Sequence, residues 1–260
     1  MAKLLWKLTA LGLLAGVAPL AAQEVADHIA MGVAANEAHD PRTALQHFQA
    51  ALEQDSSSYE ANWRAAMTLL DLGEQITARG KSPERDSLYA EAERYANLAV
   101  AADSSGPDGH FAVAATVGRR SLSMGQKARI RRASIIRREA LRTIELNPEH
   151  DGAYHILGRW NAEIMRISGL SRFFAKTFLG AGVFGQASWG RAIANMQKAV
   201  ELDSGRIVHR LELARMYADR KRLSDAEAQL HAVESLPTRE IMDSAYKQQA
   251  AELRRRITRR

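Results

Sequence analysis

The chain has 260 residues, 46% of them hydrophobic, and it contains no cysteine. This length and apolar content are enough for one long or two ordinary domains with a sizeable core, and they exclude wholesale disorder. Without cysteine the chain has no disulfide, thiol nucleophile or cysteine-ligated zinc site. The net charge of +6 leaves an anionic partner open, because the basic residues are clustered along the sequence.

The N-terminus has the residue order of a secretory signal peptide. Lys3 and Lys7 precede an apolar run over residues 8–20, and two alanines then lead into polar sequence. We therefore predict a signal peptide over residues 1–22, cleaved after Ala22, and an exported protein of the periplasm or cell envelope. An uncleaved anchor is the alternative, although the apolar run is shorter than the ~20 residues that span a bilayer. Without cleavage, a cytoplasmic or cytoskeletal protein is the alternative.

The rest of the sequence repeats one kind of helix ending. Ala192 and Ala226 are 34 residues apart, which is the length of a tetratricopeptide unit. Each ending closes an amphipathic pattern with polar stop residues such as Asp, Asn, Ser or Pro. The five endings lie at residues 51–56, 99–104, 143–148, 199–204 and 232–237.

We therefore predict an all-α fold, a tetratricopeptide-like solenoid of helical hairpins over residues 23–260. One hairpin cannot bury its apolar stripe alone, so neighbouring units stack, and a capping helix at 239–257 would cover the last apolar face. Small residues let the paired helices approach, as at Ala44 and Gly158, and large ones such as Phe48 fill the space beside them. The five predicted units are residues 25–58, 59–106, 107–150, 151–206 and 207–237.

A strongly basic stretch covers residues 119–142. It holds nine lysines and arginines, and Glu139 is its one acid. One interpretation is a solvated helix face, and the other is an electrostatic patch for anionic lipid, a membrane surface or an acidic protein tail. We do not expect a nucleic acid partner. The candidate residues for an anionic surface are Arg131, Arg132, Arg137 and Arg138.

The fourth unit carries the most specific motifs. Residues 154–160 read Tyr-His-Ile-Leu-Gly-Arg-Trp, and residues 167–171 read Ile-Ser-Gly-Leu-Ser. Over about residues 147–203 the chain resembles the regulator of microtubule dynamics family. Two of that family's motifs fall on His155, Leu157, Gly158 and Trp160, and on Leu170 and Ser171. Arg172 stands where the family usually has Trp.

This resemblance implies a tetratricopeptide-like helical domain. It also implies association with microtubules, with tubulin as a partner by family resemblance alone. Some members of the family have roles in lipid handling or membrane contact, which the resemblance extends to this chain as a further expectation.

An insertion over about residues 169–190 interrupts the fourth unit and is rich in aromatic residues. It either folds back to plug the groove and thicken the core, or it forms an apolar pocket for an acyl chain or a membrane-dipping loop. Gly180, Gly182 and Gly185 have the spacing of a dinucleotide loop, but no strand is expected before them, so we predict a turn. The aromatic candidates are Phe173, Phe174, Phe178, Phe184 and Trp189.

The concave surface of such a solenoid is formed by the first helix of each unit. Arg159 and Arg215 occupy equivalent positions in the fourth and fifth units, so they either hold a carboxylate or phosphate or are simply solvated. His155 is either a packed or capping residue or one that faces a ligand. The predicted concave-face contacts are Trp63, Phe111, His155, Arg159 and Arg215.

The sequence carries no arrangement typical of catalysis. It has no phosphate-binding loop with Gly-Lys-Ser/Thr, no metal-type histidine spacing and no recognisable nucleophile–base order. We therefore expect a non-enzymatic scaffold with no cofactor, binding a protein or peptide partner on its concave face. A lipid-binding or lipid-transfer module that uses the aromatic insertion is the first alternative. A microtubule-associated protein is the second, if the chain is not exported.

Overall fold

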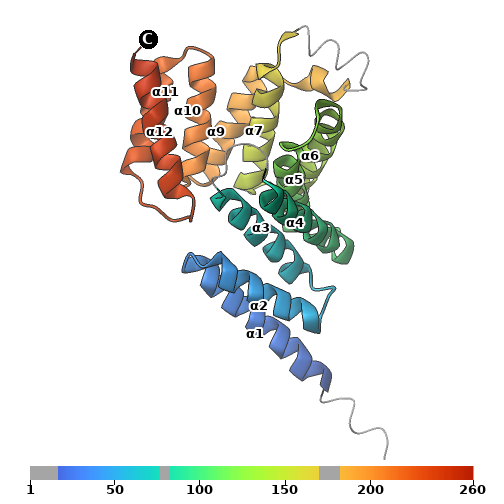
Figure 1. Cartoon of the computed structure of the whole chain (residues 1–260). Coiled ribbons are helices and arrows are strands. Elements are labelled where there is room, and N and C mark those ends of the chain that lie inside the picture. Colours follow the sequence, from blue (N-terminus) through green and yellow to red (C-terminus); the bar gives the residue numbers. More distant parts are fainter. Residues whose placement is uncertain (1–16, 77–81, 170–181, 260) are drawn as a thin grey trace, which may run out of the picture.

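The computed structural model describes residues 17–76, 82–169 and 182–259, and within these ranges it contains eleven α-helices, one short 3-10 helix and no strand. Consecutive helices pair as hairpins, which confirms the predicted all-α solenoid (Figure 1). None of the helices in these ranges combines the length and apolarity needed to cross a bilayer.

Five hairpins follow one another along the chain, and their boundaries agree with the predicted units. The first three are α1 (Val17–Glu37) with α2 (Pro41–Gln54), α3 (Tyr59–Gln75) with α4 (Pro83–Ala102), and α5 (Pro107–Ser121) with α6 (Gln126–Leu146). The last two are α7 (Asp151–Arg166) with α9 (Trp189–Leu202), and α10 (Ile207–Asp219) with α11 (Leu223–Ser235).

The two ends of the solenoid differ. At the C-terminal end α12 (Asp243–Thr258) packs on α10 and α11, as expected of a capping helix. At the N-terminal end α1 begins at Val17, upstream of the predicted cleavage site. Cleavage itself stays a prediction.

The repeated helix endings have a common physical basis. In the first four units, the second helix is followed by an Asp or Asn whose side-chain oxygen accepts a hydrogen bond from the backbone N–H two residues later, at 2.8–3.0 Å. The backbone N–H of the same residue donates to the carbonyl four residues earlier. This turn satisfies the helix end and starts the connection to the next unit. The four residues are Asp55, Asp103, Asn147 and Asp203.

Small residues let the paired helices come close, as the sequence predicts. Gly158 on α7 faces α9, where an added Cβ would lie 3.1 Å from Cε of Met196 and 3.2 Å from the carbonyl oxygen of Ala192. Ala44 and Phe48 on α2 are both fully buried, and Phe48 packs against Gly32 on α1. The core forms two main clusters, one spanning α2–α5 and the other α7–α12. Each hairpin thus depends on its neighbours for burial.

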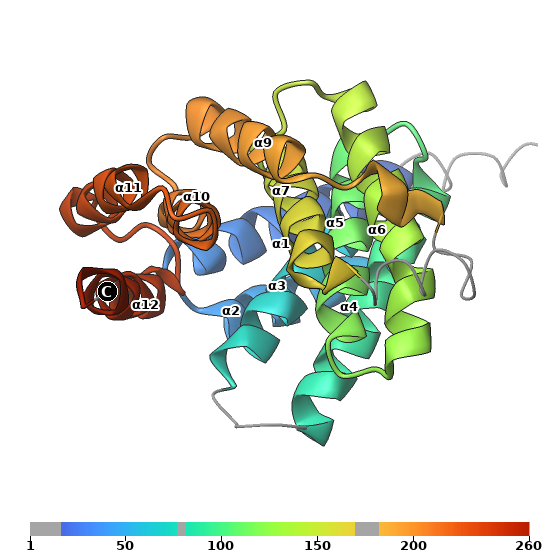
Figure 2. The same cartoon turned by 90° about the horizontal axis from the view of Figure 1, so that it is seen from above.

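The stack of hairpins curves, so that the segment leading into α12 comes near the end of α3, while α1 and α2 stay apart from α12 (Figure 1 and Figure 2). The phenolic hydroxyl of Tyr246 on α12 donates a hydrogen bond to Glu74 on α3 at 3.1 Å, although 172 residues separate them. This contact joins the last helix to the second hairpin. The concave side of the solenoid is therefore partly closed by the segment that leads into α12.

Candidate binding cavity on the concave face

The curved stack encloses a cavity of about 1020 Å³. Its wall comes mainly from the first helices of the units, α1, α3, α5, α7 and α10, with additions from α6 and residues 239–246. The volume lies at the upper end of the ~300–1,000 Å³ that small-molecule pockets occupy. Such a space accommodates a short peptide segment or several side chains of a partner.

One end of the cavity is apolar. A buried cluster there combines side chains from α6, α7 and the 3-10 helix η1 (Gly182–Gln186), and its members are Ile130, Trp160, Ile164 and Phe184. The indole N–H of Trp160 donates to the carbonyl of Ala133 at 2.8 Å. The polar atom of the ring is therefore satisfied, and its aromatic surface is left for packing.

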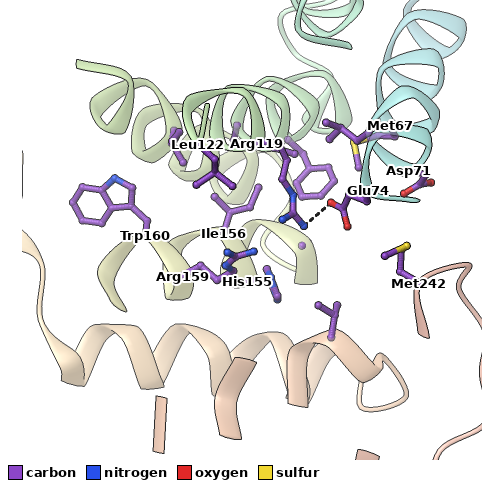
Figure 3. Close-up of a pocket in the computed structure, with 18 of the residues that line it drawn as sticks. Met67, Asp71, Glu74, Arg119, Leu122, His155, Ile156, Arg159, Trp160 and Met242 are labelled. Atoms are coloured by element: carbon purple, nitrogen blue, oxygen red, sulfur yellow. Dashed lines mark ion pairs between the residues drawn. The ribbon is translucent and has the colours of Figure 1, made fainter. Parts of the chain in front are cut away.

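The opposite end of the cavity is charged, and Figure 3 shows Asp71, Glu74 and Arg119 gathered there, away from Trp160. Arg119 on α5 forms an ion pair with Glu74 at 2.5 Å, and Glu74 also accepts the bond from Tyr246. Burial, and then the charge of Glu74, raises the pKa of the Tyr246 hydroxyl. These bonds tie together α3, α5 and α12 at the charged end.

Asp71 differs from its charged neighbours. Within the described ranges its carboxylate makes no hydrogen bond and no ion pair, yet it lines the cavity and is half-buried. Burial, and then repulsion from Glu74 and Glu240, raises the pKa of Asp71 from 3.8 to about 7. The carboxylate is therefore a hydrogen-bond acceptor available to a molecule that enters the cavity.

Two histidines of the wall, His155 and His209, form a hydrogen-bonded chain with Asp151 behind them. Nδ1 of His155 lies 2.9 Å from Nδ1 of His209, whose Nε2 lies 2.7 Å from Asp151. Burial, and then His209, holds the pKa of His155 well below its usual range, so this ring is neutral. Burial opposes ionisation of Asp151, but its bonds to His209 and Arg206 outweigh it and hold the pKa of Asp151 well below its usual range.

The tautomer of His155 follows from this chain when both rings are neutral. Asp151 accepts from Nε2–H of His209, so Nδ1 of His209 accepts from Nδ1–H of His155. Nε2 of His155 then carries a lone pair. His155 thus packs against His209 and also lines the cavity, and its contact with a ligand stays a prediction.

The two equivalent arginines of the fourth and fifth units converge on one internal carboxylate. Nη1 of Arg215 pairs with Glu212, and Nε of Arg159 lies 4.0 Å from the same side chain. Arg215 also donates to Gln249 on α12 at 2.6 Å. Glu212 is buried and takes the place that a ligand carboxylate would occupy. The two arginines were expected to bind an anion of a ligand, and in the structure the carboxylate of Glu212 lies beside them instead.

The other predicted concave-face residues divide between wall and core. Phe111, His155 and Arg159 line the cavity, whereas Trp63 and Arg215 lie outside its wall. Trp63 packs on the N-terminal core, and the guanidinium of Arg64 stacks 4.4 Å from its ring centroid. Contact of these five residues with a ligand stays a prediction.

The basic stretch does not form the uniform solvated face that we considered. Arg132 is 15% exposed and pairs with Glu93 on α4, which also pairs with Arg120. Arg137 lies 5.8 Å over the ring of Trp160. In contrast, Arg138 is 70% exposed beside Glu139, and Arg131 is exposed as well. The arginines differ in exposure because α6 packs one of its faces on α5 and α7.

The described parts of the aromatic insertion pack inward. Phe184 is 6% exposed at the apolar end of the cavity, and Trp189 packs against the C-terminal core. In the preceding motif, Leu157 is buried in a small cluster with Ala114 and Ala140. Leu170, Ser171, Phe173, Phe174 and Phe178 lie outside the described residues.

Several wall residues were not singled out from the sequence, among them Asp71, Glu74, His209 and Tyr246. Asp71 and Glu74 are spaced i, i+3, so they share one face of a first helix with Met67 and Leu70. That periodicity was a usable signal for a polar concave face. The described ranges contain no group of three His, Asp or Glu side chains placed to hold a metal ion.

Comparison with known families identifies the chain. The family model described as "Regulator of microtubule dynamics protein 1-3" matches residues 25–258. The chain belongs to this family. The resemblance noted over the fourth unit thus extends over the whole helical domain. A search of curated proteins by sequence finds no match.

Solved structures support the same fold. A thermophilic tetratricopeptide-repeat protein of Thermus thermophilus, TTC0263, is similar with a TM-score of 0.64 and 18% identity, over 88% of this chain and 97% of that one. PilF of Pseudomonas aeruginosa is similar with a TM-score of 0.53 and 14% identity, over 91% of this chain and 88% of that one. At these identities the likeness supports the fold alone.

Proposed function

We propose that this member of the family is a non-enzymatic scaffold that receives a segment of a protein partner in its concave cavity. The observation that carries the proposal is the cavity itself, which is lined by the first helices of successive units and has an apolar end and a charged end. An extended segment can place apolar side chains against one end and hydrogen-bonding groups against the other.

A matched pair of photo-crosslinking positions tests this proposal. Benzoylphenylalanine would replace Phe111 in the cavity wall or Leu98, which is 40% exposed on α4. In the native host we expect position 111 to give a crosslinked adduct with one protein partner. Position 98 should give no adduct of the same mass. An adduct from position 98 alone would place the partner on the outer surface and refute the proposal.

A lipid-binding module is the second candidate function. The observation in its favour is that Phe184, within the aromatic insertion, borders the apolar end of the cavity together with Trp160 and Ile164. An acyl chain would extend along these side chains. Mass spectrometry of an organic extract of the purified full chain tests this candidate, and an extract without a stoichiometric lipid argues against it.

The family name brings a third candidate, binding to microtubules. Co-sedimentation of the full chain with purified microtubules tests it directly. The predicted export of the chain bears on the same question, because a periplasmic protein does not meet tubulin. N-terminal sequencing of protein from the native host should give a mature chain that begins near Gln23, and a chain that keeps Met1 would speak against export.

A further inference from the structure

The charged side chains of the cavity wall are almost all paired within the chain. Five of its arginines lie 2.5–4.0 Å from acids, in the pairs Arg64–Glu60, Arg119–Glu74, Arg159–Glu212, Arg206–Glu240 and Arg239–Asp203. Glu163 pairs with Arg166. Of the remaining charged side chains, Glu37 and Arg129 are exposed at the rim. Asp71 is left as an inward-facing acid whose carboxylate has no ion pair or hydrogen bond of its own among the described residues, and the nearby Arg119 and Arg206 are each paired with another acid.

An unpaired carboxylate in a partly desolvated wall lowers the stability of the empty protein. Two further acids, Glu74 and Glu240, line the same end of the cavity and repel it. A cation that enters the cavity would remove both penalties at once. The part of the wall around Asp71 is therefore complementary to a positive group on the occupant.

The surroundings of Asp71 suit a long side chain that ends in such a group. Met67 and Leu70 line the cavity from the same helix as Asp71, and Met242 lines it from the segment before α12. Figure 3 shows Met67, Asp71, Glu74 and Met242 at one side of the cavity. Lysine and arginine have an aliphatic stem that packs on apolar side chains and a charged tip that seeks a carboxylate.

We propose, building on the function above, that the cavity selects a peptide segment that presents a lysine or arginine side chain to Asp71. An apolar residue of the same segment lies toward Trp160 at the other end. The site is thus a receptor for an apolar peptide with one cationic side chain, rather than for an acidic peptide.

Three capped pentapeptides test the proposal, each with leucine and phenylalanine around a central lysine, norleucine or glutamate. Binding of the labelled peptides to the full chain is measured by fluorescence anisotropy at pH 8, where Asp71 is mostly ionised because its pKa is about 7. We expect the lysine peptide to bind about tenfold more tightly than the norleucine peptide, and the glutamate peptide to bind most weakly.

The variant Asp71→Asn keeps the shape of the side chain and removes its charge. It should abolish the preference for lysine while changing the affinity of the norleucine peptide by less than about twofold. The control Asp27→Asn, at an exposed acid on α1, should keep the preference. A melting curve for each variant verifies that it is folded.

Three outcomes would overturn the inference: equal or tighter binding of the glutamate peptide, a lysine preference that survives in Asp71→Asn, or no binding of any of the three peptides. Failure of the proposed function is recognised separately. If all three peptides bind equally and a residue that fills the cavity blocks them all, the cavity remains the binding site and the charge selection alone is refuted.

Discussion

Two glycines show how differently two parts of this solenoid are built: the contacts between packed helices, called seams here, and the cavity wall. Both glycines lie on the first helix of a unit. Gly158 on α7 faces the partner helix α9, and a Cβ there would come within 3.1–3.2 Å of Met196 and Ala192. Gly118 on α5 faces the cavity, and its Cβ would meet nothing closer than Cδ1 of Ile136 at 3.9 Å. The seam needs its glycine for close packing, whereas the wall has room to spare.

The same contrast holds for charged groups. In the seams, charges are paired or replaced by small apolar residues, as with Arg132 and Glu93 between α6 and α4. In the wall, Asp71 is left without a partner among the described residues. The seams are therefore built for stability, and the wall keeps features that lower stability but offer recognition.

The largest effect is expected at the seam glycine. Gly158→Leu forces a side chain against Met196 and the α9 backbone, and should destabilise the fold by about 3 kcal/mol. Gly118→Leu adds the same atoms to open space and should leave the stability unchanged or raise it by ~0.5–1 kcal/mol through helix propensity. Urea denaturation measures both, and equal losses of stability would erase the distinction between seam and wall.

Charge reversal on α6 should have the next largest effect. Arg132→Glu places a carboxylate against Glu93 and should cost about 2 kcal/mol, because it breaks a largely buried pair. Arg138→Glu, at a side chain that is 70% exposed, should change the stability by no more than ~0.5 kcal/mol. If the exposed arginines also attract anionic vesicles at low salt, Arg138→Glu should weaken that attraction without unfolding the chain.

How much of this the sequence could predict depends on the range of the interactions. The hairpin boundaries follow from local turns, in which Asp55 or Asn147 bonds to the residue two positions on, so they were predictable. The cavity depends on curvature that brings Tyr246 to Glu74 across 172 residues, and no local pattern contains that information. The equivalence of Arg159 and Arg215 was read correctly from the repeat.

The position of Glu212 between Arg159 and Arg215 could not be predicted from local sequence patterns. Glu212 lies three residues before Arg215 on the same helix, and it becomes the shared carboxylate only because α7 and α10 pack side by side. The burial of Arg132 likewise depends on its ion pair with Glu93 from another hairpin. Pairings between units need the superhelical geometry, which the spacing of the repeats does not specify.

A smaller effect, of opposite sign, is expected at Asp71. The pKa of its carboxyl is about 7 in the folded protein and 3.8 in the reference state, so the folded state binds more protons between these pH values. Stability should therefore fall as pH rises from about 4 to 7. Asp71→Asn removes the charge and should raise the stability at pH 8 by about 1–2 kcal/mol. This value is smaller than the full pKa shift implies, because water in the cavity screens the charge of the half-buried carboxylate.

The pH dependence of Asp71→Asn provides the check on that prediction. Near pH 4 the variant and the native protein should differ least in stability, and the gap should widen steadily toward pH 8. The charged groups that act on Asp71 include Glu74, Glu240, Arg119 and Arg206, and all four are the same in the variant and the native protein. A variant that is less stable than the native protein at pH 8 would mean that Asp71 has a stabilising partner.

The smallest effect is expected at the contact that closes the curved stack. Tyr246→Phe removes the hydrogen bond to Glu74 and should cost about 1 kcal/mol, because Glu74 keeps its ion pair with Arg119. Tyr95→Phe is the control, since Tyr95 stacks on Arg94 through its ring and keeps this contact. Thermal melting of both variants tests whether the bond contributes, and an unchanged melting temperature for Tyr246→Phe would show that it does not.

The most direct test of the central claim combines the cavity glycine with photo-crosslinking. Benzoylphenylalanine at position 111 is introduced into Gly118→Leu, which projects a side chain into the cavity from the same helix, and into Gly190→Leu, which makes the same change at an exposed glycine. Both proteins should melt like the parent. If the partner enters the cavity, its adduct should disappear in Gly118→Leu and persist in Gly190→Leu. An adduct of undiminished yield in a folded Gly118→Leu protein would contradict the claim that the partner enters the cavity.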